Sequence, residues 1–415
     1  MLDDFGQRIR DIILSEMDLS RELSDEEICD LIGSVVSREA RDRPMTIKDR
    51  AELERTIFNS LRKLDVLQEL VDDRDVTEIM VNGPNDIFYE KAGRIQRFKG
   101  HFSSEEKLED VIQQIVGRHN RVVNQASPIV DTRLSDGSRV NIVLNPISIG
   151  GSAVSIRKFP EHPMSMERLV EIEALSPEVA RLLQILTQAK YNIFISGGTG
   201  SGKTTFLNAL SQYIPDDERI ITIEDSAELQ LLGAKNIVRL ETRNANTDGV
   251  TPITIRDLIR TALRMRPDRI IVGECRGAEA LDMLQAMNTG HDGSLTTTHA
   301  NSPRDAVSRL ETMVMMGGVE LPSKAIRDQI ASAIDLIVQQ SRLRDGTRKV
   351  VSVTEVTGME GNVVQMQDIF KYEHTGETGV DGKFIGDFVA TGIIPNALEK
   401  IRENGVAVNN DWFTN

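Results

Sequence analysis

Residues 191–208 read YNIFISGGTGSGKTTFLN: an apolar run, a glycine-rich turn and the start of a helical pattern. The turn matches the phosphate-loop pattern G-x-x-x-x-G-K-[ST] at every fixed position. Glycines let the backbone curl so that its N–H groups point at phosphate oxygens, and the N-terminus of the following helix adds partial positive charge. The alternative is a glycine-rich turn that matches by chance, but the strand–loop–helix context is the one that the motif requires.

Two side chains of this loop have distinct expected roles. Lys203 is expected to reach the β- and γ-phosphates of ATP, and the Thr204 hydroxyl is expected to ligate Mg²⁺. The predicted phosphate-binding residues are Gly197, Gly198, Thr199, Gly200, Ser201, Gly202, Lys203, Thr204 and Thr205.

Three further apolar runs end in polar side chains. RIITIED (219–225) ends at Glu224, DRIIVGE (268–274) ends at Glu274, and GSLTTTHA (293–300) leads to His299. In an open parallel sheet, ligands bind outside the carboxyl ends of the strands. We therefore expect these three side chains to lie beside the phosphate loop.

Each of these residues also has a plainer interpretation. A strand often finishes in a charged residue because it has reached solvent, and a lone histidine on a sheet is more often structural than catalytic. Beside a phosphate loop, a carboxylate such as Glu274 is suited to hold the attacking water, and His299 to sense the γ-phosphate. The aspartate that usually precedes this carboxylate is replaced by Gly273. Asp268 lies about 20 Å away along an extended strand and cannot substitute.

Arginines are expected to complete the site, because phosphoryl transfer is catalysed largely by positioned positive charge. Arg256, Arg260 and Arg264 form a stripe along one helix face, which is by default solvated. Arg264 and Arg276, however, flank DRIIVGE closely. Arg133, Arg139 and Arg157 belong to the preceding domain. A cleft between the two domains would bring those three arginines onto ATP.

Bulk composition limits the class of protein. The 415 residues are 40% hydrophobic and 27% charged, which is typical of soluble globular domains. Two cysteines form neither a disulfide framework nor a four-cysteine zinc site. The formal net charge of −15 disfavours nucleic acid as the main partner. No apolar run reaches about 18 residues and the acidic start predicts no signal peptide, so we expect membrane association only through partners.

The chain is expected to be α/β, with five parts. Residues 1–70 read as a helical region divided by Pro44, and 71–160 as a smaller α/β domain with a hairpin around Ala92-Gly93. Residues 161–175, which follow Pro160 and contain Pro163, read as a linker. Residues 176–345 alternate strand and helix signals, which predicts a mostly parallel sheet with helices on both faces. Residues 346–415 read as a hairpin and tail attached to that domain.

The ordered segments ISGGTGSGKTT, TIEDSAEL, LRMRPDRIIVGECRGAEA and TGHDGSLTTTHANSP resemble the phosphate loop, Asp box, second nucleotide motif and His box of the type II/type IV secretion ATPase superfamily. TEIMVNGP, DTRLSDGSRV and SIRKF resemble the branch that drives Tad (Flp) pilus assembly. The likeness covers roughly residues 70 to 355. The zinc-binding tetracysteine insert of the type II secretion branch is absent.

The resemblance implies a RecA-like motor domain behind an N-terminal α/β domain and a flexible linker. It implies a cytoplasmic homohexamer at the inner face of the cell membrane, with ATP and Mg²⁺ held between the domains and inner-membrane platform proteins as partners. Glu274 is implied to polarise water with Glu224 assisting, also at the metal, and His299 to contact the γ-phosphate. Arg133, Arg139 and Arg157 match arginines that close onto the nucleotide.

Several alternatives are open at this point. Pilus retraction motors and conjugation-type ATPases are near relatives of the Tad branch. A nucleic-acid translocase is disfavoured by net charge, and a nucleotide-gated scaffold without hydrolysis is disfavoured by the presence of both Lys203 and Glu274. The sequence therefore predicts a secretion or pilus ATPase and does not choose the machine.

Overall fold

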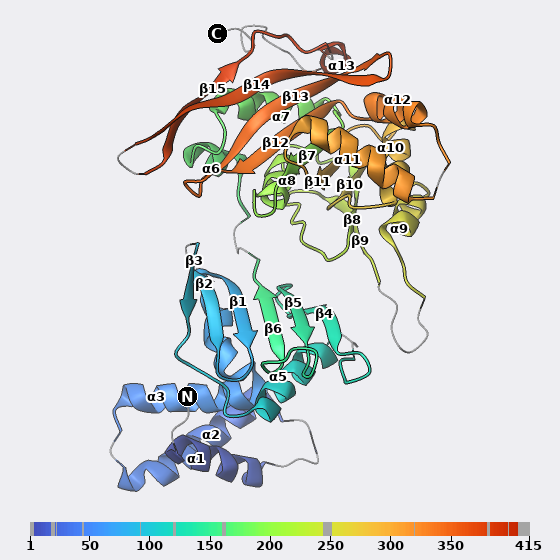
Figure 1. Cartoon of the computed structure of the whole chain (residues 1–415). Helices are drawn as coiled ribbons and strands as arrows, with labels where there is room; N and C mark the ends of the chain where they lie inside the picture. Colours follow the sequence, from blue (N-terminus) through green and yellow to red (C-terminus); the bar gives the residue numbers. More distant parts are fainter. Residues whose placement is uncertain are drawn as a thin grey trace. The chain divides into compact units, whose positions relative to one another are not determined.

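The computed structural model of the chain describes residues 4–17, 21, 23–43, 45–91, 93–118, 122–159, 163–243, 251–318, 320–379, 382–396 and 398–405. Backbone contacts divide the chain into two compact units, Met1–Glu161 (unit 1) and His162–Asn415 (unit 2) (Figure 1). Pro44, Ala92 and Pro160, which the sequence marks as a divider, a turn and a linker residue, lie outside the described residues.

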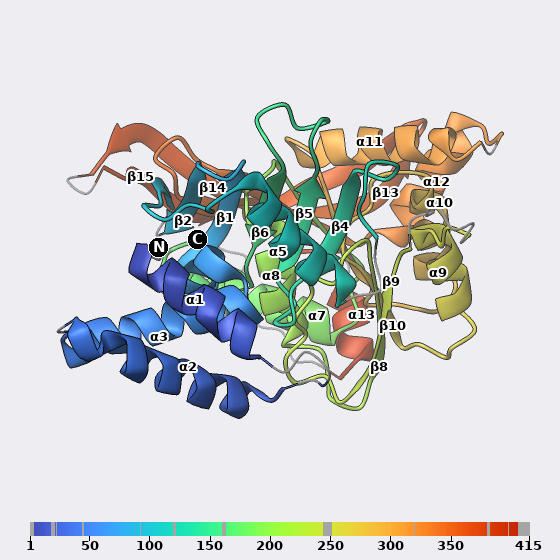
Figure 2. The same ribbon diagram turned by 90° about the horizontal axis from the view of Figure 1, so that it is seen from below.

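Unit 1 begins with three helices, α1 (Asp4–Glu16), α2 (Asp25–Glu39) and α3 (Ile47–Arg62). Ser24 and Thr46 start α2 and α3 with capping boxes, in which the cap and the third helical residue exchange side-chain hydrogen bonds with the backbone. Buried isoleucines and valines from all three helices form a small core of their own. Figure 2 shows the three helices gathered at one end of this unit.

The rest of unit 1 is a six-stranded sheet in the order β3-β2-β1-β6-β5-β4, with every neighbouring pair antiparallel. Ser104 caps α5, whose apolar side chains pack in the core of this sheet. The elements are η1 (Ala40–Asp42), η2 (Asp65–Leu67), α4 (Gln68–Asp72), β1 (Val76–Asn82), β2 (Ile87–Lys91), β3 (Arg94–Arg97), α5 (Glu105–Gly117), β4 (Ile129–Arg133), β5 (Arg139–Val143) and β6 (Ala153–Arg157).

Sequence patterns identify most of this sheet. The predicted hairpin is the β2–β3 pair, and the predicted cap at 103–104 is Ser104. The sequence does not mark β4 as a strand, because IVDTR has only two apolar residues before polar ones. The regions predicted as 1–70 and 71–160 fall in one compact unit.

Unit 2 contains a nine-stranded sheet in the order β15-β14-β13-β12-β7-β11-β10-β8-β9. The six strands from β12 to β9 are parallel, and β13, β14 and β15 extend the sheet in antiparallel fashion. The strands are β7 (Ile193–Gly197), β8 (Arg219–Glu224), β9 (Asn236–Glu241), β10 (Arg269–Val272), β11 (Leu295–Thr298), β12 (Leu336–Arg342), β13 (Arg348–Glu360), β14 (Val363–Thr378) and β15 (Phe384–Ala390). The predicted mostly parallel sheet is confirmed.

Helices cover both faces of this sheet, as Figure 1 shows. Side chains of α6, α7, α8 and α13 share one hydrophobic core, and those of α9 to α12 share the other. The helices are α6 (Met166–Glu171), α7 (Pro177–Gln188), α8 (Lys203–Ser211), α9 (Ile255–Ala262), α10 (Glu279–Asn288), α11 (Pro303–Met316), α12 (Ser323–Ala333) and α13 (Leu398–Glu403). None of the helices in the described ranges is long and apolar enough to cross a membrane.

The segment predicted as a linker, 161–175, differs in the structure. Ser165 caps α6, and Met166, Leu169 and Leu175 are buried in the core of unit 2. Prolines at 160 and 163 mark the boundary between the units, but the apolar residues after them belong to the packed domain. The tail also contains more structure than the predicted hairpin, because β15 and α13 follow it.

Candidate functional site

The strand order of unit 2 places polar strand ends beside the phosphate loop. β7 runs into the loop, β11 lies directly beside β7, and β10 lies beside β11. These strands are parallel, so their carboxyl ends meet at one edge of the sheet. His299 follows β11 and Glu274 follows β10 at that edge.

The loop between β7 and α8 has the conformation that its glycines permit. Gly200 and Gly202 adopt φ values of +71° and +96°, in the left-handed region that favours glycine. A Cβ at Gly197 would lie 2.5 Å from both the Gln340 carbonyl oxygen and Ser201 Oγ. Glycine is therefore required at positions 197, 200 and 202 of this loop.

Lys203 is the first residue of α8 and is only 8% exposed. Its Nζ donates to the Gly198 carbonyl at 3.0 Å and lies 3.4 Å and 3.5 Å from the two ring nitrogens of His299. Burial lowers the pKa of Lys203. Among the described residues it forms no ion pair with a carboxylate, so an anionic ligand would satisfy this buried ammonium.

His299 connects Lys203 to Glu274. Its Nε2 lies 2.8 Å from Glu274 Oε1, and Glu274 Oε2 accepts a hydrogen bond from Arg276 Nη2 at 2.5 Å. Burial, opposed by Glu274, lowers the pKa of His299, which favours the neutral ring near pH 7. Glu274 Oε1 is buried and has no aligned hydrogen-bond partner among the described residues. Such an oxygen is able to accept a bond from water.

Neighbouring strands hold the turn that carries Glu274. Thr297 Oγ1 donates to the Gly273 carbonyl at 2.7 Å, and the Cys275 backbone N–H donates to the Thr297 carbonyl at 2.9 Å. The sequence shows three consecutive threonines at 296–298 but does not reveal that one of them fixes this turn.

Glu224 ends β8, one strand beyond β10, and is 3% exposed. Its Oε1 accepts backbone hydrogen bonds from Glu228 at 2.9 Å and Leu229 at 2.8 Å. Burial raises its pKa to about 7. The carboxyl therefore anchors the loop after β8, and its expected role at a metal stays a prediction.

The described ranges contain no group of three or more His, Cys, Asp or Glu side chains arranged to hold a metal ion. Mg²⁺ often keeps several waters and binds through few protein ligands together with substrate phosphates. The half-buried Thr204 at the start of α8 fits that type of site. The protein alone does not form a metal cage in these ranges.

The arginines predicted from the sequence fall into different places. Arg276 belongs to the group around Glu274. Arg264 precedes β10 and lies at the opposite, amino-terminal edge of the sheet, where Arg219 Nε donates to the Met265 carbonyl. The structure of unit 2 does not bring Arg264 to the phosphate loop. Arg256 and Arg260 both bind the buried Asp282, so this pair is not simply solvated.

Arg133, Arg139 and Arg157 form one row across three strands of unit 1. Arg133 pairs with Arg139 between β4 and β5, and Arg139 pairs with Arg157 between β5 and β6. Directly paired residues project from the same face of a sheet, and here the alternate residues of β5, Val140 and Ile142, are buried. The row thus lies on the face away from the core.

Two residues that sequence reasoning missed also contact the phosphate loop. Arg348, the first residue of β13, donates from Nε to the Gly200 carbonyl at 2.8 Å. Gln340 of β12 pairs with Gly197 of β7. No motif marks either residue, since their approach depends on the pairing of β12 with β7.

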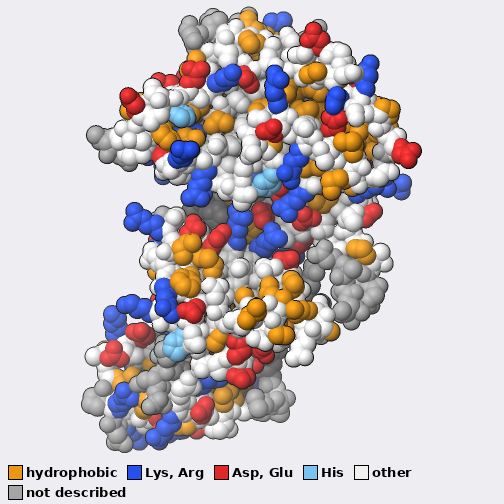
Figure 3. Space-filling model, viewed as in Figure 1, with side chains coloured by type: hydrophobic (Ala, Val, Ile, Leu, Met, Phe, Trp, Pro, Cys, Tyr) orange, Lys and Arg blue, Asp and Glu red, His pale blue; other side chains and the backbone are white. Residues whose placement is uncertain are grey.

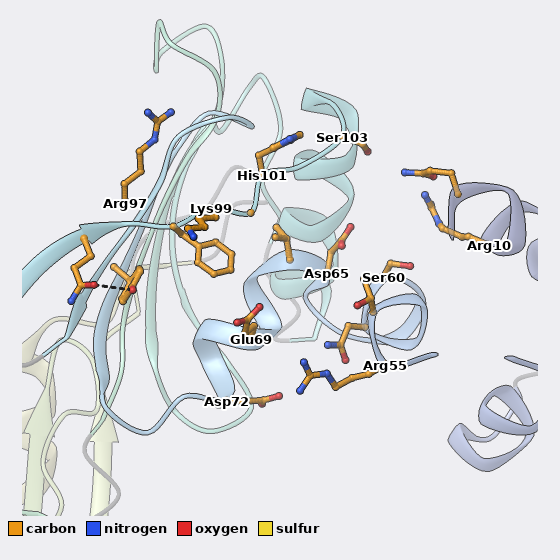
Figure 4. A pocket seen from close by; sticks show the side chains of 18 residues that line it. Arg10, Arg55, Ser60, Asp65, Glu69, Asp72, Arg97, Lys99, His101 and Ser103 are labelled. Carbon is orange, nitrogen blue, oxygen red and sulfur yellow. Dashed lines mark hydrogen bonds between the residues drawn. The ribbon is translucent and has the colours of Figure 1, made fainter. Parts of the chain in front are cut away.

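A cavity of about 620 Å³ lies elsewhere, within unit 1, between α1, α3, α4 and the β2–β3 hairpin (Figure 4). Its walls carry both charge signs, including Arg10, Arg55, Asp65, Glu69 and Lys99. None of the predicted site residues lines it. On the face drawn in Figure 3, acidic and basic side chains are likewise interspersed.

The fold of this chain is that of RecA-like α/β proteins. A crystal structure of the pilus retraction motor PilT with bound ADP matches 83% of this chain and 87% of that chain, with 20% identity and a TM-score of 0.53. A structure of the Yersinia pseudotuberculosis ATPase DotB matches 70% and 77%, with 20% identity and a TM-score of 0.52.

The chain belongs to the type II/IV secretion system protein family, whose model matches residues 60–382. A putative conjugal transfer protein of Mycobacterium tuberculosis is 33% identical over 74% of this chain and 89% of its own length. The type IV secretion system protein VirB11 of Brucella suis is 32% identical over 70% of this chain and 88% of its own length. The superfamily resemblance seen in the motifs is therefore confirmed, whereas closeness to the Tad branch is not specifically shown.

Proposed function

We propose that this chain is a cytoplasmic ATPase motor that hydrolyses Mg²⁺-ATP to drive pilus assembly or secretion through an inner-membrane platform. The observation that carries the proposal is the contact series Lys203–His299–Glu274 at the carboxyl edge of the parallel sheet. This edge holds, beside the glycine-rich loop, the buried ammonium of Lys203, the ring of His299 and a carboxylate oxygen of Glu274 that has no aligned partner among the described residues. Family membership favours a motor over another use of such a loop.

Each residue has a specific task in this proposal. Lys203 binds the β- and γ-phosphate oxygens of ATP, which replace the Gly198 carbonyl as its partners. Glu274 orients the attacking water, and neutral His299 donates to the γ-phosphate. Thr204 holds Mg²⁺, with Glu224 assisting. When bound, Mg²⁺ supplies neutralising charge on the phosphate oxygens.

The arginines of unit 1 have a role only in an assembled motor. The row Arg133–Arg139–Arg157 places three guanidinium groups on one sheet face, where Asp131 and Glu78 lie 3.9 Å from Arg139 and 4.0 Å from Arg157. Guanidinium groups are suited to bind a polyphosphate. We propose that this face closes on the nucleotide within a homohexamer, in which each arginine serves its own subunit or a neighbour. Family resemblance supports this assignment.

Tad (Flp) pilus assembly is the machine that we propose first, because TEIMVNGP, DTRLSDGSRV and SIRKF resemble that branch. Conjugation-type secretion is the second candidate, and the relatives named for conjugal transfer and type IV secretion favour it. Removal of the gene separates the two: loss of surface fibres supports the first, and loss of DNA or effector transfer with intact fibres supports the second.

The direct test is phosphate release by purified wild type and by Glu274→Gln. The amide keeps the size of the carboxylate but cannot orient water as a base, so turnover should fall by about 10²- to 10⁴-fold while ATP affinity is kept. Glu178→Gln, an exposed change in the first turn of α7, is the control and should hydrolyse ATP like wild type. Full turnover by Glu274→Gln would remove the proposed role, and a wild type without hydrolysis would favour a scaffold. DNA-stimulated hydrolysis would favour a translocase.

A further inference from the structure

The first three residues of β13, Arg348, Lys349 and Val350, connect two distant parts of unit 2. Arg348 Nε donates to the Gly200 carbonyl at the tip of the phosphate loop. A Cβ at Gly202 would lie 3.4 Å from Arg348 Cδ, so the arginine stem packs on the loop as well. The remaining guanidinium nitrogens of Arg348 have no partner among the described residues, and the side chain is exposed.

The next two residues bind the turn that follows α6. Lys349 Nζ donates to the Glu173 carbonyl at 2.6 Å, and the Val350 backbone N–H donates to the Ala174 carbonyl at 2.8 Å. Lys349 is 6% exposed, so this contact is buried. Glu173 has a φ of +58°, a conformation that a residue with a side chain rarely adopts without support from its surroundings. This turn lies about a dozen residues after the boundary between the two units.

Gln340 of β12 also contacts the phosphate loop. Its backbone carbonyl lies against Gly197, and its side-chain Oε1 lies 3.9 Å from the position of a Cβ on Gly202. Oε1 is buried without a hydrogen-bond partner among the described residues, and the residue is 6% exposed. A buried amide oxygen without a partner is costly, so it marks a place where an added donor would be favourable.

We propose that Arg348 is a positioning residue of the phosphate loop, and that Arg348, Lys349 and Val350 form a strap that couples this loop to the 173–174 turn. The inference rests on the proposed function and adds a regulation of the same site. Binding of the nucleotide phosphates fixes the loop tip, and Arg348 transmits that order to β13. The strap then stabilises the turn that leads back toward unit 1.

The physical basis is the short, continuous path between the two contacts. Consecutive residues of an extended strand rise about 3.3 Å each. A restraint on the backbone at position 348 therefore also restricts the motion of residue 350. The hydrogen bond from Arg348 to the Gly200 carbonyl also restricts the backbone of a glycine-rich loop, and glycine loses more conformational entropy on ordering than other residues. A loop that is already ordered before the nucleotide binds raises the affinity for it, which is an effect of pre-organisation.

The test uses full-length wild type with the variants Arg348→Ala and Arg344→Ala. Arg344 is exposed in the same β12–β13 turn region and has no contact with the loop among the described residues, which makes it the matched control. Titration with a fluorescent ADP analogue should show about three- to tenfold weaker binding for Arg348→Ala, the range that corresponds to the loss of one hydrogen bond of ordinary strength. Arg344→Ala should bind within about twofold of wild type.

Hydrogen exchange of peptides covering 168–175 and 349–353 measures the coupling itself. Saturating ADP should slow exchange in both peptides of wild type and of Arg344→Ala, and should slow neither peptide in Arg348→Ala. Lys349→Met, which cuts the contact with Glu173, should bind ADP normally and lose protection only in the first peptide.

Equal affinity of Arg348→Ala and wild type would overturn the positioning role, and ADP-dependent protection of both peptides in Arg348→Ala would overturn the strap. Neither readout needs hydrolysis. A wild type that binds ADP but releases no phosphate therefore contradicts the proposed function alone. A wild type that binds no ADP contradicts both.

Discussion

Gly273 lies directly against Glu224, because a Cβ at position 273 would come within 3.0 Å of Glu224 Cγ. The position where phosphate-loop ATPases often carry an aspartate is therefore filled by a glutamate from the adjacent strand. We predict that Gly273→Asp does not restore a metal ligand but lowers stability by about 2 kcal/mol, as overpacking of a buried site does. Thermal denaturation measures the loss.

A double-mutant cycle separates this crowding from other effects. Glu224→Ala removes the obstructing side chain, so Gly273→Asp should cost less in that background than in wild type. If Gly273→Asp melts like wild type and turns over ATP at an undiminished rate, the steric explanation fails.

Glu224 should also give unit 2 a pH-dependent stability. Burial raises its folded-state pKa from 4.5 to about 7, so between these values the folded state holds a proton that the unfolded state has released. Stability should fall as pH rises through this window and level off above it, by at most about 3 kcal/mol. Melting curves at pH 5 to 8, compared with Glu224→Gln, measure the effect.

The difference between wild type and Glu224→Gln should shrink or reverse toward pH 8, because glutamine does not titrate. Glu178→Gln, on an exposed helix start, is the control and should follow wild type at every pH. A constant difference between wild type and Glu224→Gln would show that Glu224 keeps an ordinary pKa in the fold.

The parallel part of the sheet could be predicted because its signals are local. Apolar runs such as IFIS and RIIV, each bounded by a turn and followed by a helical pattern, leave few other arrangements. The antiparallel pairing of β12, β13 and β14 is local, because these strands follow one another closely in the chain. Their attachment to the parallel sheet depends on the pairing of β12 with β7, which lie far apart in the sequence, and periodicity does not specify that pairing. The sequence does not predict the short helix α6, because the two prolines just before it are typical of a linker.

Only the site residues that directly follow a strand could be predicted from the sequence. Lys203, His299 and Glu274 each follow a recognisable strand, and the sheet rule brings such ends together. Arg264 is close to Glu274 in the sequence, but it precedes β10 instead of following it, so the prediction that it joins the site is wrong. Arg348 gave no signal, because its contact with Gly200 is created by strand pairing.

The arginine row of unit 1 allows a test that distinguishes catalysis from structure. Arg139 stands opposite both Arg133 and Arg157, and like charges that face each other across strands are destabilising by about 0.2–1 kcal/mol. Its ion pair with Asp131, at 3.9 Å and at the surface, offsets this repulsion by a comparable small amount. Arg139→Ala should therefore leave the melting temperature unchanged or slightly higher. If the row stabilises the transition state, turnover should fall by at least about tenfold.

Arg97→Ala is the matched control, since Arg97 lies on β3 at the far edge of the same sheet and pairs with Asp86. It should change neither property by much. Loss of stability in Arg139→Ala with full turnover would instead assign the row a structural role.

Arg269 and Glu218 form a buried ion pair that no motif predicts. Arg269 is 0% exposed; it donates from Nε and Nη2 to the two carboxylate oxygens of Glu218, and from Nη1 to the Thr187 carbonyl at 2.8 Å and the Gly293 carbonyl at 3.2 Å. Removing one partner leaves the other charge buried, so Arg269→Met should lower stability by about 3–5 kcal/mol. Glu218→Met should lower stability by a comparable amount. The double variant should recover part of the lost stability, because no uncompensated charge is left in the core. Calorimetry of the three variants measures these differences in stability. Losses that simply add would mean that the pair is not electrostatically coupled and that the backbone contacts of Arg269 account for its burial.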